Sequence, residues 1–279
     1  MSSLLNIFFD LINIPPIRFT AKKILGLIEF KKDICIHVGG FRIYSNTIDR
    51  LLASLMWKFE SLEGFETQIL KENLKKGMAI IDIGANIGYY TLFIGNKIGK
   101  QGNVYAFEPE PNNFRLLTKN ILKNNIQNIH PFQKAVSDKN GSIKLFISKE
   151  HRGDHKIFET NDKRPSITVD QVSIDDFLKD KRKIDLIKMD IQGAEHLALE
   201  GLKHTIAENK DIIIITEFSP ELLRESGGNP EDFLDNLISM GFKIRLIDEK
   251  NKILKPIDKN ELIRICKGAR YENLYLSRS

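Results

Sequence analysis

A regular alternation of short apolar runs with longer amphipathic segments begins after Gly77 and limits the fold more than any other feature. The run Ile212–Ile215 is unbroken, as in strands that are buried on both faces. Such alternation predicts a doubly wound α/β domain, in which helices cover both faces of a largely parallel sheet. Strands are expected at Met78–Ile83, Val104–Phe107, Ile129–Gln133, Ile184–Met189, Ile212–Glu217 and Phe242–Ile247, and helices at Tyr89–Ile98, Pro111–Asn124, Ala194–Glu208 and Pro230–Met240.

Three segments depart from this alternation of strands and helices. Ser142–Ser148 and Ile167–Ser173 are typical of strands, yet only a polar, histidine-bearing stretch separates them. This arrangement predicts an antiparallel excursion and a loop rather than another strand–helix unit. The last segment, Asn273–Ser277, predicts one more strand near the C-terminal end.

The residues before the alternation predict a separate unit. Two glycines connect apolar runs at Ile34–Val38 and Phe41–Tyr44, which is typical of a hairpin. A helix is expected at Phe65–Leu74. We therefore expect an N-terminal helical and hairpin cap at residues 1–76 and one α/β domain at residues 77–279.

The segment Leu4–Ile12 is apolar around most of a helix. It is too short to span a bilayer, which needs about 20 apolar residues, and it lacks the charged start and cleavage site of a signal peptide. We expect it to pack against the protein or a second subunit, which leaves a homodimer open. The lysines that follow it favour, as the alternative, weak contact with a membrane surface.

Composition excludes several classes of protein. Hydrophobic residues make up 42% and charged residues 28%, and the net charge is +5, which argues against a disordered, fibrous or polytopic membrane protein. The two cysteines, Cys35 and Cys266, form no CxxC or Cys/His cluster, so the sequence predicts neither a disulfide framework nor a metal site. A reducing, cytoplasmic location fits best.

The turn from the first strand to the first helix carries the most specific motif. It contains Gly84, Asn86 and Gly88, with Asp82 two residues earlier, and so departs from the GxGxxG pattern that holds a pyrophosphate. An acidic residue before the loop repels a pyrophosphate and suits an ammonium group. A ligand that combines an amino acid with a nucleoside therefore fits better than NAD.

Further carboxylates follow the ends of neighbouring strands. Glu108 ends the second strand, where a carboxylate accepts hydrogen bonds from a ribose diol, and capping of the next helix is the alternative. Asp190, Glu195 and Glu217 follow two later strands. Several acids at one edge of a sheet are costly unless they meet a cationic ligand or share protons. The alternative for Glu195 and Glu217 is compensation of a helix N-terminus.

With these motifs, the sequence from Phe65 to Ser277 resembles the FkbM family of S-adenosylmethionine-dependent methyltransferases. The segments that carry the resemblance are Asp82–Thr91, Phe107–Pro109, Lys134–Asp138 and Lys188–Glu195. The resemblance implies the class I methyltransferase (Rossmann-like) fold, a seven-stranded and mostly parallel sheet whose last strand is antiparallel. It also implies S-adenosyl-L-methionine as the cofactor.

The resemblance assigns roles to individual residues. Gly84, Asn86, Gly88 and Thr91, with Asp82, would surround the methionine part of the cofactor; Glu108 and Pro109 would hold the ribose; and Ala135 and Val136 would lie near the adenine. One departure is visible, because Gln192 stands where the family usually has a glutamate. Any role of that glutamate as a base or metal ligand is therefore in doubt for this chain.

These roles predict an O-methyltransferase that acts on a small molecule, a glycan or a lipid-linked saccharide. Removal of the acceptor proton falls to Asp190 or, less favoured, Glu217, with His151, His155 and His196 as alternatives for which surface or structural roles are commoner. The net positive charge keeps an RNA methyltransferase open, although no NPPY-like motif is present. A non-catalytic, cofactor-binding scaffold is the third interpretation.

Overall fold

The computed structural model describes residues 29–47, 64–148, 153–160, 163–178, 183–268 and 270–278. The predictions for residues 4–12 and for His151 therefore lie outside the described part of the chain. No helix within these ranges combines the length and the apolar character that crossing a bilayer requires.

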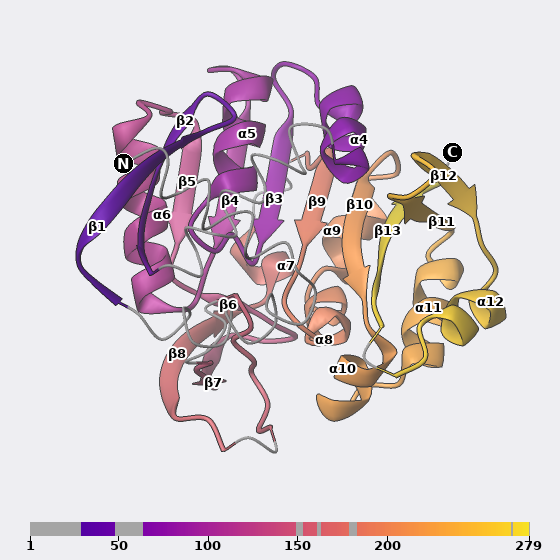
Figure 1. Ribbon diagram of the computed structural model, residues 1–279. Coiled ribbons are helices and arrows are strands. Elements are labelled where there is room, and N and C mark those ends of the chain that lie inside the picture. The colour runs from indigo at the N-terminus through magenta and orange to yellow at the C-terminus, as the bar shows by residue number, and fades with distance from the viewer. Residues whose placement is uncertain are drawn as a thin grey trace.

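An eight-stranded sheet with the order β12-β11-β13-β10-β9-β3-β4-β5 forms the centre of the molecule (Figure 1). The strand β13 lies between β10 and β11 and is antiparallel to both, as expected for the last strand. The expected seven strands are joined by an eighth, β12, which forms an antiparallel edge hairpin with β11. The strands are β3 Ala79–Ile83, β4 Asn103–Phe107, β5 Ile129–Phe132, β9 Leu186–Met189, β10 Ile213–Phe218, β11 Lys243–Asp248, β12 Ile253–Pro256 and β13 Glu272–Ser277.

Helices cover both faces of this sheet, as the alternation predicts. Ile80, Leu186 and Ile215 face one core, and Ile81, Ile187 and Ile214 face the other, because successive side chains of a strand point to opposite faces. The first core is covered by α4 Phe65–Asn73, α5 Tyr89–Ile98 and α6 Pro111–Lys123, and the second by α7 Ile174–Phe177, α8 Glu195–Glu200, α9 Lys203–Glu208, α10 Pro220–Glu225, α11 Pro230–Ser239 and α12 Lys259–Ile265.

The predicted hairpin is confirmed and packs on α6. Its strands are β1 Glu29–Val38 and β2 Phe41–Thr47, and Val38 and Ile43 contribute to the same core as α4–α6. The carboxylate of Asp33 receives hydrogen bonds from the guanidinium of Arg115 and the ammonium of Lys119 on α6. The domain boundary at residue 76 stays a prediction.

A small second sheet lies beyond the carboxyl ends of β4 and β5, toward the bottom of Figure 1. Its strands are β6 Ala135–Val136, β7 Gly141–Phe146 and β8 Ser166–Val172, and β7 pairs with β8 in antiparallel fashion. The predicted antiparallel excursion is therefore confirmed, and it borders the edge of the main sheet where the candidate site lies.

The continuous helix predicted over Ala194–Glu208 is wrong. The structure contains two short helices, α8 and α9, with Gly201 between them. A Cβ atom on Gly201 would lie 2.1 Å from the carbonyl oxygen of Ser137, so only glycine allows the backbone to approach the second sheet here.

Candidate active site

The turn between β3 and α5 requires glycine at two positions. Gly84 has a φ of +87°, and an added Cβ would lie 2.0 Å from the carbonyl oxygen of Asp190. Gly88 has a φ of +94°, and its Cβ would lie 2.5 Å from the side chain of Leu117. Asn86 between them also has a positive φ, of +51°. The loop therefore packs closely against the residues after β9 and against α6.

Asp82 lies beneath this loop. Its carboxylate is 2% exposed and accepts a 2.6 Å hydrogen bond from the hydroxyl of Thr91, which is itself fully buried. Burial raises the pKa of Asp82, and the nearby ammonium of Lys188 lowers it. The structure thus brings Asp82 and Thr91 together with the glycine loop, and contact with a cofactor ammonium group stays a prediction.

Glu108 follows β4 and supports the glycine loop from the other side. One carboxylate oxygen accepts the backbone N–H of Asn86 at 2.9 Å, and the other accepts the backbone N–H of Glu110 at 3.0 Å and the side-chain amide of Asn113 at 3.3 Å. Because a carboxylate offers about four acceptor positions, about one remains for a ribose hydroxyl. Burial raises the pKa of Glu108 to about 7.

Capping of α6 belongs to Glu110 rather than to Glu108. The Glu110 carboxylate accepts the backbone N–H of Asn113 at 2.7 Å, as a residue at the N-cap position does. Pro109 is half-buried between the two acids. The alternative that Glu108 merely caps this helix is therefore not needed.

Asp190 follows β9 and is exposed, so that an acceptor can reach it. The backbone N–H of Asp190 donates to the carbonyl of Ile83 at 3.0 Å, which places it beside the glycine loop. The side-chain amide of Gln192 donates to the Asp190 carboxylate at 2.9 Å. A glutamine at this position therefore orients the carboxylate, which a glutamate could not do by donating a hydrogen bond.

Two further carboxyls surround Asp190. Burial, followed by the negative charges of Asp190 and Glu195, raises the pKa of Glu217 to about 9. Burial raises the pKa of Glu195 to about 7, and its carboxylate accepts the backbone N–H of Ile191 at 3.1 Å. Glu217 thus holds a proton at neutral pH, whereas Glu195 shapes the turn after β9.

Ala135 and Val136 are buried on β6, just beyond the end of β5. The carbonyl of Phe132 on β5 accepts the backbone N–H groups of both Glu108 and Lys134. This shared acceptor brings the start of β6 next to Glu108, on the side of the site where the adenine was predicted.

The two candidate histidines that lie within the described ranges, His155 and His196, have roles in the fold. His155 accepts the backbone N–H of Ser148 at 3.1 Å. The ring of His196 packs against Gly228, where an added Cβ would lie 2.9 Å from it, and burial lowers the pKa of His196. Asp190 is therefore the better candidate for a base.

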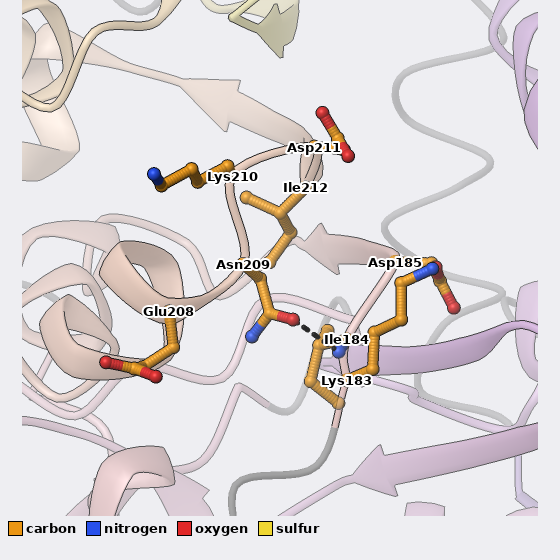
Figure 2. Close-up of a pocket in the computed structure, with 8 residues that line it drawn as sticks. All are labelled: Lys183, Ile184, Asp185, Glu208, Asn209, Lys210, Asp211 and Ile212. Atoms are coloured by element: carbon orange, nitrogen blue, oxygen red, sulfur yellow. Dashed lines mark hydrogen bonds and ion pairs between the residues drawn. The ribbon is translucent and has the colours of Figure 1, made fainter.

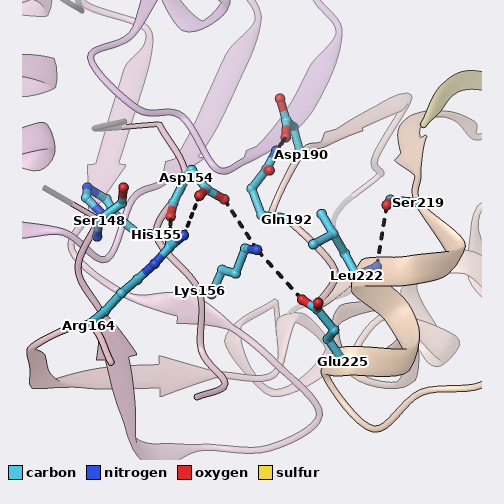
Figure 3. A network of polar contacts seen from close by, with 10 residues as sticks. All are labelled: Ser148, Asp154, His155, Lys156, Arg164, Asp190, Gln192, Ser219, Leu222 and Glu225. Carbon is cyan, nitrogen blue, oxygen red and sulfur yellow. Dashed lines mark hydrogen bonds and ion pairs between the residues drawn. The ribbon is translucent and has the colours of Figure 1, made fainter. Parts of the chain in front are cut away.

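A polar network borders the site on the side of the second sheet (Figure 3). Lys156 is 8% exposed and lies 3.7 Å from Asp154 and 3.9 Å from Glu225 on α10. A Cβ on Gly153 would lie 3.2 Å from the side-chain amide of Asn86. The stretch from Gly153 to Lys156 thus connects the glycine loop with α10.

Sequence reasoning missed two charged residues, Lys188 on β9 and Glu66 on α4. Lys188 stands within an otherwise apolar strand and lies 3.9 Å from the carboxylate of Glu66. The interruption of an apolar run by a lysine was the available signal, whereas nothing in the sequence marks Glu66.

A pocket of about 440 Å³ lies far from these residues, at the amino ends of β9 and β10 (Figure 2). Charged side chains from both strand starts line it, among them Asp185 and Lys210. Across the described ranges, no group of three or more histidine, cysteine, aspartate or glutamate side chains is arranged to hold a metal ion.

Comparison with known proteins identifies several similar sequences. Methyltransferase 1 of Beauveria bassiana is 26% identical over 144 residues, which span 44% of this chain and 57% of that protein. The hexuronic acid methyltransferase AglP of Haloferax volcanii is 26% identical over 57% of this chain and 65% of its own length. The 2-O-methyltransferase NoeI of Sinorhizobium fredii is 28% identical over 57% and 70%, respectively. The matched regions of the first two relatives thus cover less than two thirds of each.

Among solved structures, a SAM-dependent O-methyltransferase from Thermotoga maritima is 14% identical and superposes with a TM-score of 0.45, covering 88% of this chain and 78% of that one. The family model described as the methyltransferase FkbM domain matches residues 82–244, which is more than half of the chain and includes the glycine loop, Glu108, Asp190 and Glu217. The chain therefore belongs to the FkbM methyltransferase family.

Proposed function

We propose that the chain is an S-adenosylmethionine-dependent O-methyltransferase that acts on a hydroxyl group of a sugar or a related small molecule. The observation that carries the proposal is the convergence of the glycine loop, Glu108 and Asp190 at one edge of the sheet. Family membership supports the reaction class. The printed names of AglP and NoeI, a hexuronic acid methyltransferase and a 2-O-methyltransferase, support a sugar acceptor.

The residues present fit this cofactor. A positive sulfonium and an ammonium group suit an edge lined by Asp82, Glu108 and Asp190, whereas a pyrophosphate would be repelled there. When bound, S-adenosylmethionine supplies an activated methyl group. Gly84 lets the loop pack directly against the Asp190 backbone, and Glu108 retains about one acceptor position for a ribose hydroxyl.

The chain's own task is then to align the acceptor and remove its proton. Alignment of two reactants can lower a barrier by about 7–11 kcal/mol in favourable geometry. Exposed Asp190, oriented by Gln192, accepts the hydroxyl proton, because Glu217 is already protonated at neutral pH. Tyr271 directly precedes β13, the strand that pairs with β10 at Glu217. Its side chain is 58% exposed and is the proposed aromatic contact for the acceptor.

Transfer of a labelled methyl group from S-adenosylmethionine tests the proposal. Hexuronic acid glycosides, neutral glycosides and total RNA serve as parallel acceptors. We expect label on a sugar hydroxyl, with none in RNA. Label that appears only in RNA and is lost on RNase treatment would establish the alternative enzyme, and cofactor binding without transfer to any acceptor would favour the scaffold.

We also propose that the protein works in the cytoplasm and that residues 4–12 are drawn only weakly to anionic membranes. The free thiols of Cys35 and Cys266 support a reducing compartment. Flotation with anionic liposomes compares the full chain with a chain that starts at Pro15. Strong, salt-sensitive binding that the truncation abolishes would contradict the proposal.

A further inference from the structure

Lys188 is a buried cation that the proposed reaction does not yet use. It is the third residue of the central strand β9, and its side chain is only 8% exposed, between the core residues Ile187 and Met189. A buried ammonium is costly unless it is compensated by nearby charge. Its surroundings show what compensates it.

Three neighbouring elements contact this ammonium or lie directly beside it. Lys188 is in register with Asp82 on the parallel strand β3, so both side chains stand on the same face of the sheet. The Nζ atom lies 3.9 Å from a carboxylate oxygen of Glu66 on α4 and 4.4 Å from the ring centroid of Tyr90 on α5. The ammonium therefore lies between α4 and the elements that flank the glycine loop, β3 and α5.

Glu66 is held in place rather than free to move. The carboxylate of Glu249 accepts the backbone N–H groups of Phe65 and Glu66, each at 2.8 Å, and so fixes the start of α4. The side-chain amide of Asn273 donates to Glu66 at 2.9 Å, and Asn273 is in register with Glu217 on β10. Glu66 is thus a fixed counter-ion of Lys188, although it lies outside residues 77–279.

The charges around Lys188 keep it protonated. Burial lowers the pKa of Lys188, but the surrounding carboxylates raise it by more, and its pKa ends above the ordinary value. Burial also raises the pKa of Glu66, which Lys188 lowers. The titratable groups that face this cation are Glu66 of α4, Asp82 of β3, Tyr90 of α5, Asp190 after β9 and Glu217 of β10, with Glu249 beside Glu66 and Glu195 beside Glu217.

We propose, building on the function proposed above, that Lys188 is a positioning residue of the reaction. Its ammonium, anchored by Glu66 from α4, holds the negative charge of Asp190 and the orientation of Glu217 at the edge where the acceptor is deprotonated. The two residues act in opposite senses, because Lys188 favours the charged form of a neighbouring carboxyl, whereas the negative charge of Glu66 favours its protonated form.

Opposite shifts of the pH–rate profile test this role. Lys188→Met removes a cation, so protonation of the nearby carboxyls becomes easier and the acidic limb of the profile moves to higher pH, by about one unit or more. Glu66→Gln removes a competing anion, so the same limb moves to lower pH. Lys188→Arg keeps the charge and retains the wild-type limb. A purely structural role would lower the melting temperature of the variants without moving the limb in opposite directions.

Lys183→Met is the matched control, because Lys183 is exposed and lies before the amino end of β9, paired with Asp185 at 2.9 Å. Its profile is expected to match that of the wild type. Unchanged limbs in Lys188→Met and Glu66→Gln, or limbs that move in the same direction, would overturn the proposal. Should Lys188→Met fail to fold, Glu66→Gln decides alone: a limb at lower pH supports the role, and any other result overturns it.

The proposal can fail separately from the proposed function. If the wild-type chain transfers no methyl group to any acceptor, the function fails, and ¹³C NMR titration of labelled Asp and Glu carboxyls takes the place of the rate profile. The signals of Asp190 and Glu217 are assigned by their loss in Asp190→Asn and Glu217→Gln. The signal of Glu217 is expected to titrate at higher pH in Lys188→Met and at lower pH in Glu66→Gln; no change would overturn the role.

Discussion

Glu108 does more than a ribose acceptor requires, because its carboxylate also holds the backbone of Asn86 in the glycine loop and of Glu110 at the start of α6. In the proposed function, this single side chain would couple recognition of the cofactor's ribose to the shape of the loop. Burial of the Glu108 carboxyl raises its pKa to about 7. Cofactor affinity should consequently depend on pH near neutrality.

The first prediction follows from the ionisation of Glu108. A hydroxyl donates more strongly to the carboxylate than to the carboxylic acid, so the affinity for S-adenosylmethionine is expected to fall as the pH drops through about 7. From pH 8 to pH 6 the dissociation constant should rise by up to about tenfold. Calorimetric titration measures it, with Glu108→Gln as the control that loses this step. An identical pH dependence in wild type and variant would contradict the assignment.

Asp190 is expected to act in chemistry rather than in cofactor binding. Asp190→Asn keeps the size of the side chain but cannot accept a proton, so turnover should fall by about 10²–10⁴-fold. The affinity for S-adenosylmethionine should stay within a few-fold of the wild-type value. Parallel measurements of kcat and cofactor affinity check this, and a collapse of affinity with surviving turnover would make Asp190 a binding residue.

Gly84 tests the close approach between the loop and the residues after β9. Gly84→Ala introduces a Cβ that would lie 2.0 Å from the Asp190 carbonyl oxygen, in addition to the cost of a φ of +87°. Gly99→Ala is the control, because Gly99 has a φ of +70° and open space around its Cβ position. We expect the free energy of unfolding to fall by about 1 kcal/mol for Gly99→Ala and by several kcal/mol for Gly84→Ala. Chemical denaturation measures both values. Equal losses of unfolding free energy in the two variants would show that the Gly84 backbone does not lie this close to the Asp190 carbonyl in solution.

At the scale of elements, α6 joins the hairpin to the glycine loop. The side chain of Asn120 is fully buried, accepts the backbone N–H of Tyr44 on β2 at 2.7 Å and donates to the carbonyl of Ile87 in the loop at 2.8 Å. The N-terminal hairpin therefore supports the glycine loop through α6.

Asn120→Ala is expected to destabilise the fold and the loop together. It leaves the half-buried N–H of Tyr44 and the buried carbonyl of Ile87 without their partner, at a cost of about 1–3 kcal/mol for a group that is fully buried. Asn124→Ala, one turn later, removes bonds to exposed Arg42 and should cost about 1 kcal/mol or less. Thermal unfolding and cofactor titration of both variants check this. A larger loss of stability or of cofactor affinity in Asn124→Ala than in Asn120→Ala would refute the role of Asn120.

At the scale of the whole molecule, the sequence predicts the α/β architecture because continuous apolar runs such as Ile212–Ile215 occur only where both faces are buried. It does not predict β12, because Ile253–Pro256 is an edge strand with no buried residue. It also does not predict the break at Gly201, which depends on a contact with Ser137, far away in the chain.

In the candidate site, too, the sequence predicts the features that depend on local signals and not those that depend on contacts between distant segments. Glycine spacing and carboxylates at strand ends are local signals, and they place Asp82, Gly84, Glu108 and Asp190 at one edge. Partners are not local signals. The approach of Glu66 to Lys188 depends on how distant segments pack, and Glu66 lies outside the alternating region altogether.

Calorimetric titration of the full chain with S-adenosylmethionine, in parallel with NAD and with Glu108→Gln as the variant, tests the central claim most directly. We predict that S-adenosylmethionine binds one site per chain, that NAD gives no binding heat, and that Glu108→Gln weakens the affinity by about 10- to 100-fold, as expected for loss of a charged hydrogen-bond acceptor. Binding of NAD in place of S-adenosylmethionine, or affinity that is unchanged in a folded Glu108→Gln variant, would contradict the account.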